Sequence, residues 1–156
     1  MTETLAAVAA RTDATIASAR AELVSAVRAA HGSGMTQQQI AREIRRSQPE
    51  VSRLLHFHGT TPLGRTLRAN SRHVEQILKA AGGVDIRVFG SVATGTDRED
   101  SDIDLLVTMR QPVSLLELSA VERELTALLG TKVDVVPDTT LRPDIRERVL
   151  SEAIAL

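Results

Sequence analysis

The apolar residues in the first eighty positions recur at helical spacing. Residues 3–30 contain neither Gly nor Pro, and Val8, Ile16, Leu23 and Val27, with alanines between them, form one face of a helix. Gly and Pro interrupt the pattern around residues 31–34 and 58–62, where helices end. The sequence therefore predicts helices at 3–30, 36–45, 48–57 and 62–81.

The second half of the chain changes to short apolar runs typical of strands. Three such runs, at 84–89, 103–109 and 132–136, predict strands. Ser114 and Glu117 have the spacing of a capping box, which predicts a helix that ends before Gly130, and Pro143 opens a last helix. The fold class expected is α+β: an all-helical module over residues 1–61, followed by a domain of strands and helices over residues 62–156.

The composition narrows the range of functions. Hydrophobic residues make up 42% of the 156 positions, which is enough for a core. Phe57 and Phe89 are the only aromatic residues, so stacking of bases on aromatic side chains is excluded, and the lack of cysteine excludes disulfides and thiolate metal sites. No apolar run has the length of a membrane span and the N-terminus lacks a basic signal opening, so we expect a cytoplasmic protein with no membrane partner.

Charge is unevenly distributed between the two halves. Residues 34–73 contain seven arginines against two glutamates, a local balance of +5, whereas the chain from residue 74 onward is acidic. A basic segment beside an acidic one indicates two different partners.

Carboxylates gather where two of the predicted strands begin. Asp102 and Asp104 are two residues apart, so they point to the same side of a strand, and Asp134 lies in the next strand along the chain. Magnesium prefers oxygen ligands, and three carboxylates on neighbouring strands suit a phosphoryl-transfer site. Gly90 and Ser91 follow the first strand, where backbone N–H groups can hold phosphates. Each feature alone is usually a turn or a solvated strand end, and only their combination favours chemistry.

These residues resemble the signature of the minimal nucleotidyltransferases, members of the DNA polymerase beta superfamily. The resemblance covers residues 62–156 and rests on Gly90-Ser91, ten further residues, Asp102-Ile103-Asp104, and the KVDVV strand. It implies a polymerase-beta-like fold, a small mixed sheet flanked by helices, and Mg²⁺ and ATP as cofactors. Asp102 and Asp104 would be metal ligands, Asp134 the third carboxylate as ligand or base, and Gly90 and Ser91 would hold the triphosphate.

The same resemblance implies a partner. Many such proteins are antitoxins that inactivate a HEPN-type toxin by transferring AMP to one of its tyrosines. This chain departs from the family pattern at Thr94, where members often carry a basic phosphate ligand, and Arg98 is a candidate replacement.

Residues 35–57 are similar to a helix-turn-helix of the Cro/Xre type. The resemblance implies operator-DNA contacts by Gln37, Gln48, Pro49, Glu50, Ser52 and Arg53. Arg45 and Arg46 replace the usual turn glycine and the apolar residue after it, and a left-handed Arg45 would cost about 1–2 kcal/mol, so we expect a different turn there. The alternative to DNA binding is that residues 35–57 form a helical adaptor whose arginines are solvated. The helix at 3–30 has two alternative roles: it forms a homodimer, or it covers the module.

Two functions from different classes follow. The first is a magnesium-dependent transferase of AMP to a toxin, acting as antitoxin and as repressor of its own operon; three carboxylates without a metal would repel one another, which favours this hypothesis. The second is a non-catalytic DNA-binding regulator, which Thr94 favours. Nucleotidylation of a small molecule needs a further substrate domain, and only 22 residues follow Asp134. A template-directed polymerase needs a larger region still.

Overall fold

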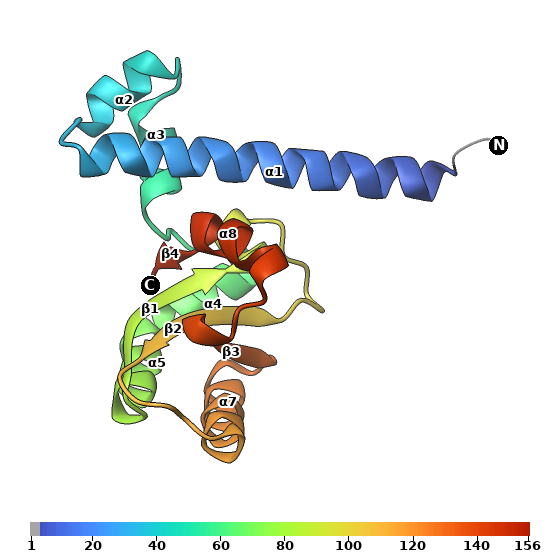
Figure 1. Ribbon diagram of the computed structural model, residues 1–156, viewed down its shortest axis with the longest axis vertical. Coiled ribbons are helices and arrows are strands. Elements are labelled where there is room, and N and C mark those ends of the chain that lie inside the picture. The colour runs from blue at the N-terminus through green and yellow to red at the C-terminus, as the bar shows by residue number, and fades with distance from the viewer. Residues whose placement is uncertain (1–3) are drawn as a thin grey trace. The chain divides into compact units, whose positions relative to one another are not determined.

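The structure, a computed structural model, describes residues 4–156 and contains two compact units (Figure 1). The first unit ends at Leu55 and the second runs from His56 to Leu156, whereas the sequence placed the boundary between residues 61 and 62. Phe57, assigned to the helical module from sequence, instead packs against the core of the second unit. Burial of this aromatic side chain explains why the division falls earlier in the chain.

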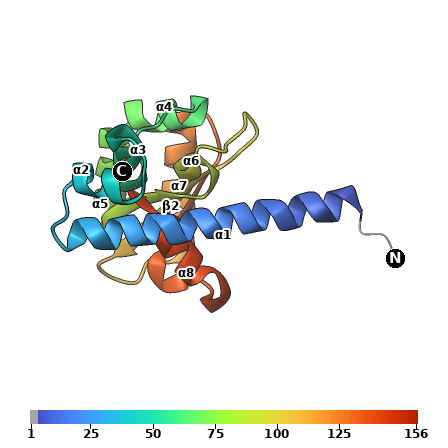
Figure 2. The same ribbon diagram turned by 90° about the horizontal axis from the view of Figure 1, so that it is seen from above.

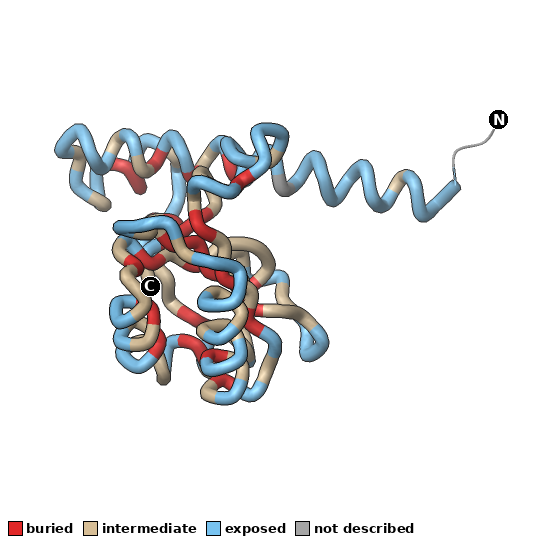
Figure 3. The backbone as a smooth tube through the Cα atoms, turned by 60° about the horizontal axis from the view of Figure 1, so that its bottom comes forward, coloured by how far each residue is buried: buried red, intermediate tan, exposed pale blue. Residues whose placement is uncertain are grey.

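The first unit is built from α1 (Leu5–Gly32), α2 (Gln37–Glu43) and α3 (Gln48–Leu55). Residue 3, where the first predicted helix begins, lies outside the described residues. The C-terminal half of α1 packs on the other two helices through a core of Val24, Val27, Ile40, Ala41, Val51 and Leu54. Its N-terminal half, residues 5–16, is exposed apart from the half-buried Val8 (Figure 3). Helix α1 therefore covers the module over about half of its length.

The turn between α2 and α3 corrects one expectation. Arg45 has a φ of +55°, so this arginine does adopt the left-handed conformation that we expected the chain to avoid. The backbone N–H of Arg46 donates to the carbonyl of Ala41 at 2.9 Å, a bond that closes the end of α2 and requires this turn. The strain is thus offset by a satisfied helix terminus.

The second unit contains a four-stranded mixed sheet with the order β3-β2-β1-β4. Strands β1 (Gly83–Phe89), β2 (Ile103–Met109) and β3 (Val133–Pro137) confirm the three predicted strands to within one residue. Strand β1 pairs antiparallel with β2 and with β4 (Ile154–Ala155), and β2 pairs parallel with β3. Strand β4 was not predicted from the sequence, because two residues are too few to show the alternation of apolar and polar positions that marks a strand.

Helices cover both faces of this sheet. One face packs against α4 (Pro62–Ala69), α5 (Ser71–Ala80) and α7 (Leu115–Leu129), which share a core with Ile103, Leu105 and Val107 of β2. The other face carries Leu106 and packs against α8 (Pro143–Glu152), with a short 3₁₀ turn η1 (Asp138–Thr140) before it. Burial on both sides explains the nearly continuous apolar run of β2.

Three terminus signals can be compared with the structure. The capping box of Ser114 and Glu117 is present at the start of α7, and Gly130 ends that helix at a φ of +70°. The single helix predicted over 62–81 is wrong: Asn70 separates α4 from α5, and its side chain donates to the carbonyl of Thr66. Asn favours such local bonds over helix continuation.

Among the residues described, no helix is long and apolar enough to cross a membrane.

Candidate active site

The sheet brings the predicted carboxylates into one row. Asp104 on β2 is paired in register with Phe89 on β1 and with Asp134 on β3. Asp102 precedes Asp104 by two residues and so faces the same side as Asp104. Side chains that are distant in sequence therefore lie side by side at the end of the sheet where β2 and β3 begin.

Gly90 joins this row from β1, because it follows Phe89 and opens α6 (Gly90–Thr94). Its φ is +71°, and a Cβ atom at this position would lie 2.6 Å from Oδ2 of Asp104. Only glycine satisfies both conditions. Helix α6 lies beside α4 (Figure 2) and also contacts β2, and Ser91 directly follows Gly90 in this helix.

Thr94 closes α6 with hydrogen bonds to the backbone. Its hydroxyl donates to the carbonyls of Gly90 at 3.2 Å and Ser91 at 3.3 Å. The residue thus shapes the turn without supplying charge. Arg98, the candidate replacement for a basic residue, is exposed in the loop before β2, where its backbone N–H donates to Ser101 Oγ at 2.8 Å.

Asp104 holds a proton more tightly than an ordinary aspartate does. Burial is the main cause that raises the pKa of Asp104 to about 6, and the charges of Asp134 and Asp102 raise it further, while Lys132 opposes them. The ionised form of Asp104 is therefore destabilised in this row. A site with this property favours a bound cation.

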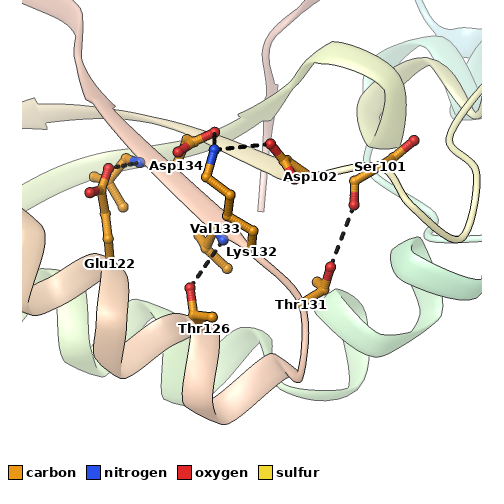
Figure 4. A network of polar contacts seen from close by, with 9 residues as sticks. Ser101, Asp102, Glu122, Thr126, Thr131, Lys132, Val133 and Asp134 are labelled. Atoms are coloured by element: carbon orange, nitrogen blue, oxygen red, sulfur yellow. Dashed lines mark hydrogen bonds and ion pairs between the residues drawn. The ribbon is translucent and has the colours of Figure 1, made fainter.

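Lys132 supplies such a cation from the protein itself, a role that the sequence analysis missed. Its Nζ donates to Oδ2 of Asp102 at 3.1 Å and to Oδ2 of Asp134 at 3.0 Å (Figure 4). Hydrogen bonds to Asp134 and then Asp102 raise the pKa of the Lys132 ammonium. Its position two residues before Asp134 is a signal that could have placed it on the same side of the strand.

The donor set suits a magnesium ion chemically. Asp102, Asp104 and Asp134 offer only carboxylate oxygens, the ligands that this hard cation prefers. Within the described part of the chain, however, no three acidic or histidine side chains converge closely enough to hold a metal ion in this conformation. The Lys132 ammonium lies between two of the three carboxylates. The metal-ligand assignment stays a prediction.

Helix α7 holds the outer edge of β3 beside this row (Figure 4). Thr126 Oγ1 accepts from the backbone N–H of Val133 at 3.2 Å, and Glu122 Oε1 accepts from that of Val135 at 2.9 Å. These two N–H groups flank Asp134 and have no neighbouring strand to donate to. The two side chains therefore fix the strand that carries the third carboxylate.

The residues predicted to contact DNA lie on α2 and α3. Gln48, Pro49 and Arg53 are exposed, while Gln37, Glu50 and Ser52 are partly buried. Gln48 Nε2 donates to Gln37 Oε1, so this pair links the two helices. The Glu50 carboxylate accepts from the backbone N–H and the hydroxyl of Ser47, both at 2.8 Å, and so caps α3.

Comparison with known proteins identifies relatives of the second unit. The family described as "Nucleotidyltransferase domain" matches residues 71–156. The protein adenylyltransferase MntA of Thermococcus cleftensis is 39% identical over 82 residues, which cover 53% of this chain and 83% of that protein.

Two solved structures share the fold. One, described as a candidate minimal nucleotidyltransferase, is 44% identical with a TM-score of 0.55, and the match covers 64% of this chain and all of that one. The other is a toxin–antitoxin with AMP-PNP, at 22% identity and a TM-score of 0.50, covering 54% of this chain and 69% of that one. At this identity the second match shows a common fold alone.

Proposed function

The chain belongs to the Nucleotidyltransferase domain family and is a nucleotidyltransferase, and from this premise we propose that it transfers AMP from ATP to a partner protein. The observation that carries the proposal is the row formed by Asp102, Asp104 and Asp134 beside Gly90. The relative from Thermococcus cleftensis, itself named a protein adenylyltransferase, supports AMP as the group and protein as the acceptor.

The residues of the row divide the chemistry between them. Asp102 and Asp104 would hold magnesium, which would neutralise charge on the phosphates, and the backbone N–H groups at Gly90 and Ser91 would bind the triphosphate. A hydroxyl oxygen of the acceptor forms a bond to the α-phosphorus as the bond to the leaving pyrophosphate breaks. Asp134 either completes the metal site or accepts the proton of that hydroxyl, since a carboxylate can do both.

The acceptor proposed is a toxin of the HEPN type, with this chain as its antitoxin. Support comes from the resemblance of residues 62–156 to the minimal nucleotidyltransferases, and from a toxin–antitoxin structure that shares the fold. Transfer of AMP adds a phosphodiester charge and a bulky group to a tyrosine. Both changes oppose the binding of RNA in a ribonuclease site.

The first unit is proposed as a DNA-binding helix-turn-helix that represses the protein's own operon. Helices α2 and α3 are joined by a four-residue turn and share a core, and the exposed Arg53 lies on the second of them. This geometry suits a recognition helix, and half-site recognition would use a homodimer. The arginines of the segment add the charge that phosphate contacts need.

A second candidate function is a non-catalytic regulator that binds nucleotide or a partner. The observation that favours it is Thr94, an uncharged residue whose hydroxyl is bonded to backbone carbonyls. The two candidates differ in whether AMP becomes covalently attached to another protein.

Label transfer separates them. The purified protein with Mg²⁺ and a lysate of the source cell receives ATP labelled at the α-phosphate, or in parallel at the γ-phosphate. Transferase activity labels a protein band from the α position alone, and the band is lost in Asp104→Asn but kept in Asp144→Asn, a change of an exposed carboxylate on α8. If no protein band is labelled even when the purified partner toxin is added, the result favours the non-catalytic regulator.

DNA binding has its own test. Arg53→Ala should weaken operator binding by about 1–3 kcal/mol in a gel-shift titration if Arg53 contacts a base. Arg110→Ala, an exposed arginine of the second unit, serves as the matched control. Equal loss in both variants, or none in Arg53→Ala, would remove Arg53 from the interface.

A further inference from the structure

Lys132 places a single positive charge beside the row of carboxylates, between Asp102 and Asp134. Its ammonium contacts Asp102 and Asp134 at 3.1 and 3.0 Å; Asp102 directly precedes β2, and Asp134 lies on β3. An ammonium with two carboxylate oxygens at such distances occupies the space of a cation that would bridge the same two groups. A divalent ion and Lys132 Nζ cannot both hold these oxygens in this way.

The backbone of Lys132 is held by the sheet, whereas its side chain is largely exposed. Its carbonyl accepts from the N–H of Ile103 at 3.0 Å, which anchors the residue at the start of β3. The side chain beyond it is 64% exposed. An exposed four-carbon stem can move its ammonium by several ångströms without disturbing the sheet, and its ion pairs in water are weak enough to exchange.

We propose that Lys132 is an exchangeable counter-ion: it neutralises Asp102 and Asp134 until a metal–nucleotide complex binds, and then moves its charge onto the phosphates. This inference rests on the proposed function and assigns Lys132 as a nucleotide-binding residue of that site. A divalent ion held by the carboxylates would repel the ammonium, and the triphosphate would be the nearest new negative charge for it to contact. The displaced Lys132 thereby supplies the basic group that Thr94 lacks.

The proposal predicts opposite effects on two ligands. Lys132→Met removes the competitor for the carboxylates, so Mn²⁺ alone should bind about fivefold more tightly, as followed by the free-ion signal in electron paramagnetic resonance. The same variant lacks a phosphate ligand, so the non-hydrolysable analogue AMP-PNP with Mg²⁺ should bind about tenfold more weakly, as followed by calorimetry. Neither measurement depends on turnover.

Three control variants sharpen the test. Lys132→Arg keeps the charge and should retain the wild-type Mn²⁺ affinity and most of the nucleotide affinity. Lys79→Met removes an exposed lysine that pairs with Glu75 on α5, and should change neither affinity. Asp134→Asn removes a carboxylate of the row and should weaken Mn²⁺ binding at least about tenfold.

The outcomes are distinguishable. Unchanged Mn²⁺ affinity in Lys132→Met, with the loss in Asp134→Asn, overturns the counter-ion while the proposed metal site stands. Tighter Mn²⁺ with unchanged or tighter AMP-PNP overturns the movement onto phosphates. Wild-type Mn²⁺ affinity in Asp134→Asn contradicts the proposed metal site itself. Opposite shifts for the two ligands, seen in Lys132→Met and absent in Lys132→Arg and Lys79→Met, support the proposal.

Discussion

Gly90 lies directly against the carboxylate of Asp104, so closely that a Cβ atom at residue 90 would approach Oδ2 to 2.6 Å. The two residues belong to different elements, since Gly90 opens α6 and Asp104 lies on β2. The contact aligns the phosphate-binding turn with the carboxylate row. A side chain at residue 90 therefore has to displace Asp104.

Gly90→Ala and Gly95→Ala form a matched pair that isolates this contact. Both glycines have a similar positive φ, +71° and +74°, but a Cβ at Gly95 would meet no atom within 4 Å. Each substitution should lower the free energy of unfolding by about 1–2 kcal/mol in urea titrations, because alanine is strained in the left-handed region. Only Gly90→Ala should also weaken Mn²⁺ binding, because it moves Asp104. Equal Mn²⁺ affinity in the two variants would show that the contact does not position the carboxylate.

Asp104→Asn should stabilise the metal-free protein in a pH-dependent way. The pKa of Asp104 is raised to about 6 in the folded protein, so folding favours its protonated form and the wild type loses stability as pH rises from about 4 to 6. The variant has no charge to lose there. After allowance for solvent screening of a half-exposed group, it should be more stable by about 1–2 kcal/mol at pH 7.5.

Urea titrations in a chelator at pH 4 and pH 7.5 check this prediction. The advantage of Asp104→Asn should be small at pH 4, since the aspartate is then largely protonated in the folded protein. An advantage that is constant with pH would mean that the substitution acts through packing and not through charge.

Glu122→Ala should destabilise the second unit by about 1–3 kcal/mol, because it leaves the backbone N–H of Val135 unpaired in a partly buried setting. Glu122→Gln keeps the accepting oxygen and should cost much less. Chemical denaturation measures both, and amide exchange at Val135 should accelerate in the alanine variant alone. If the two variants were equally stable, the hydrogen bond from Val135 would not contribute to the stability of β3.

Arg45→Gly should stabilise the first unit by about 0.5–1 kcal/mol. Glycine has no steric penalty at a φ of +55°, although it loses more entropy on folding, and the strain relieved is the larger effect. Arg46→Gly next to it is the control, and it should destabilise because that residue has no positive φ. Thermal unfolding checks both, and a loss of stability in Arg45→Gly would mean that the arginine side chain outweighs the strain.

Local patterns predicted the elements that carry their own signals. The helix from Ser114 is marked by a capping box and an end glycine, and strand β2 by an apolar run after two aspartates, so both were confirmed. Asp102 and Asp104 could be placed on one face because strand periodicity needs no tertiary information.

What could not be predicted depends on contacts between distant segments. The register of Asp104 with Asp134 is set by how β3 docks, and the contact of Lys132 with Asp102 follows from that register. The left-handed conformation of Arg45 is imposed by the end of α2, because arginine itself does not favour a positive φ. Strand β4 is defined by its pairing with β1, which no local sequence pattern indicates.

The parallel pairing of β2 with β3 has a consequence for the order in which the molecule gains structure. Parallel strands need a crossover, here α7, and until this segment docks, Asp134 is far from Asp102 and Asp104. The repulsion within the row therefore opposes the docking of the crossover and leaves the pairing of β1 with β2 unaffected. A cation that binds the row therefore stabilises the docked crossover and not the pairing of β1 with β2. Unfolding of the α7–β3 segment should thus be slowed by metal or nucleotide, so that the substrate also sets the lifetime of the site that binds it.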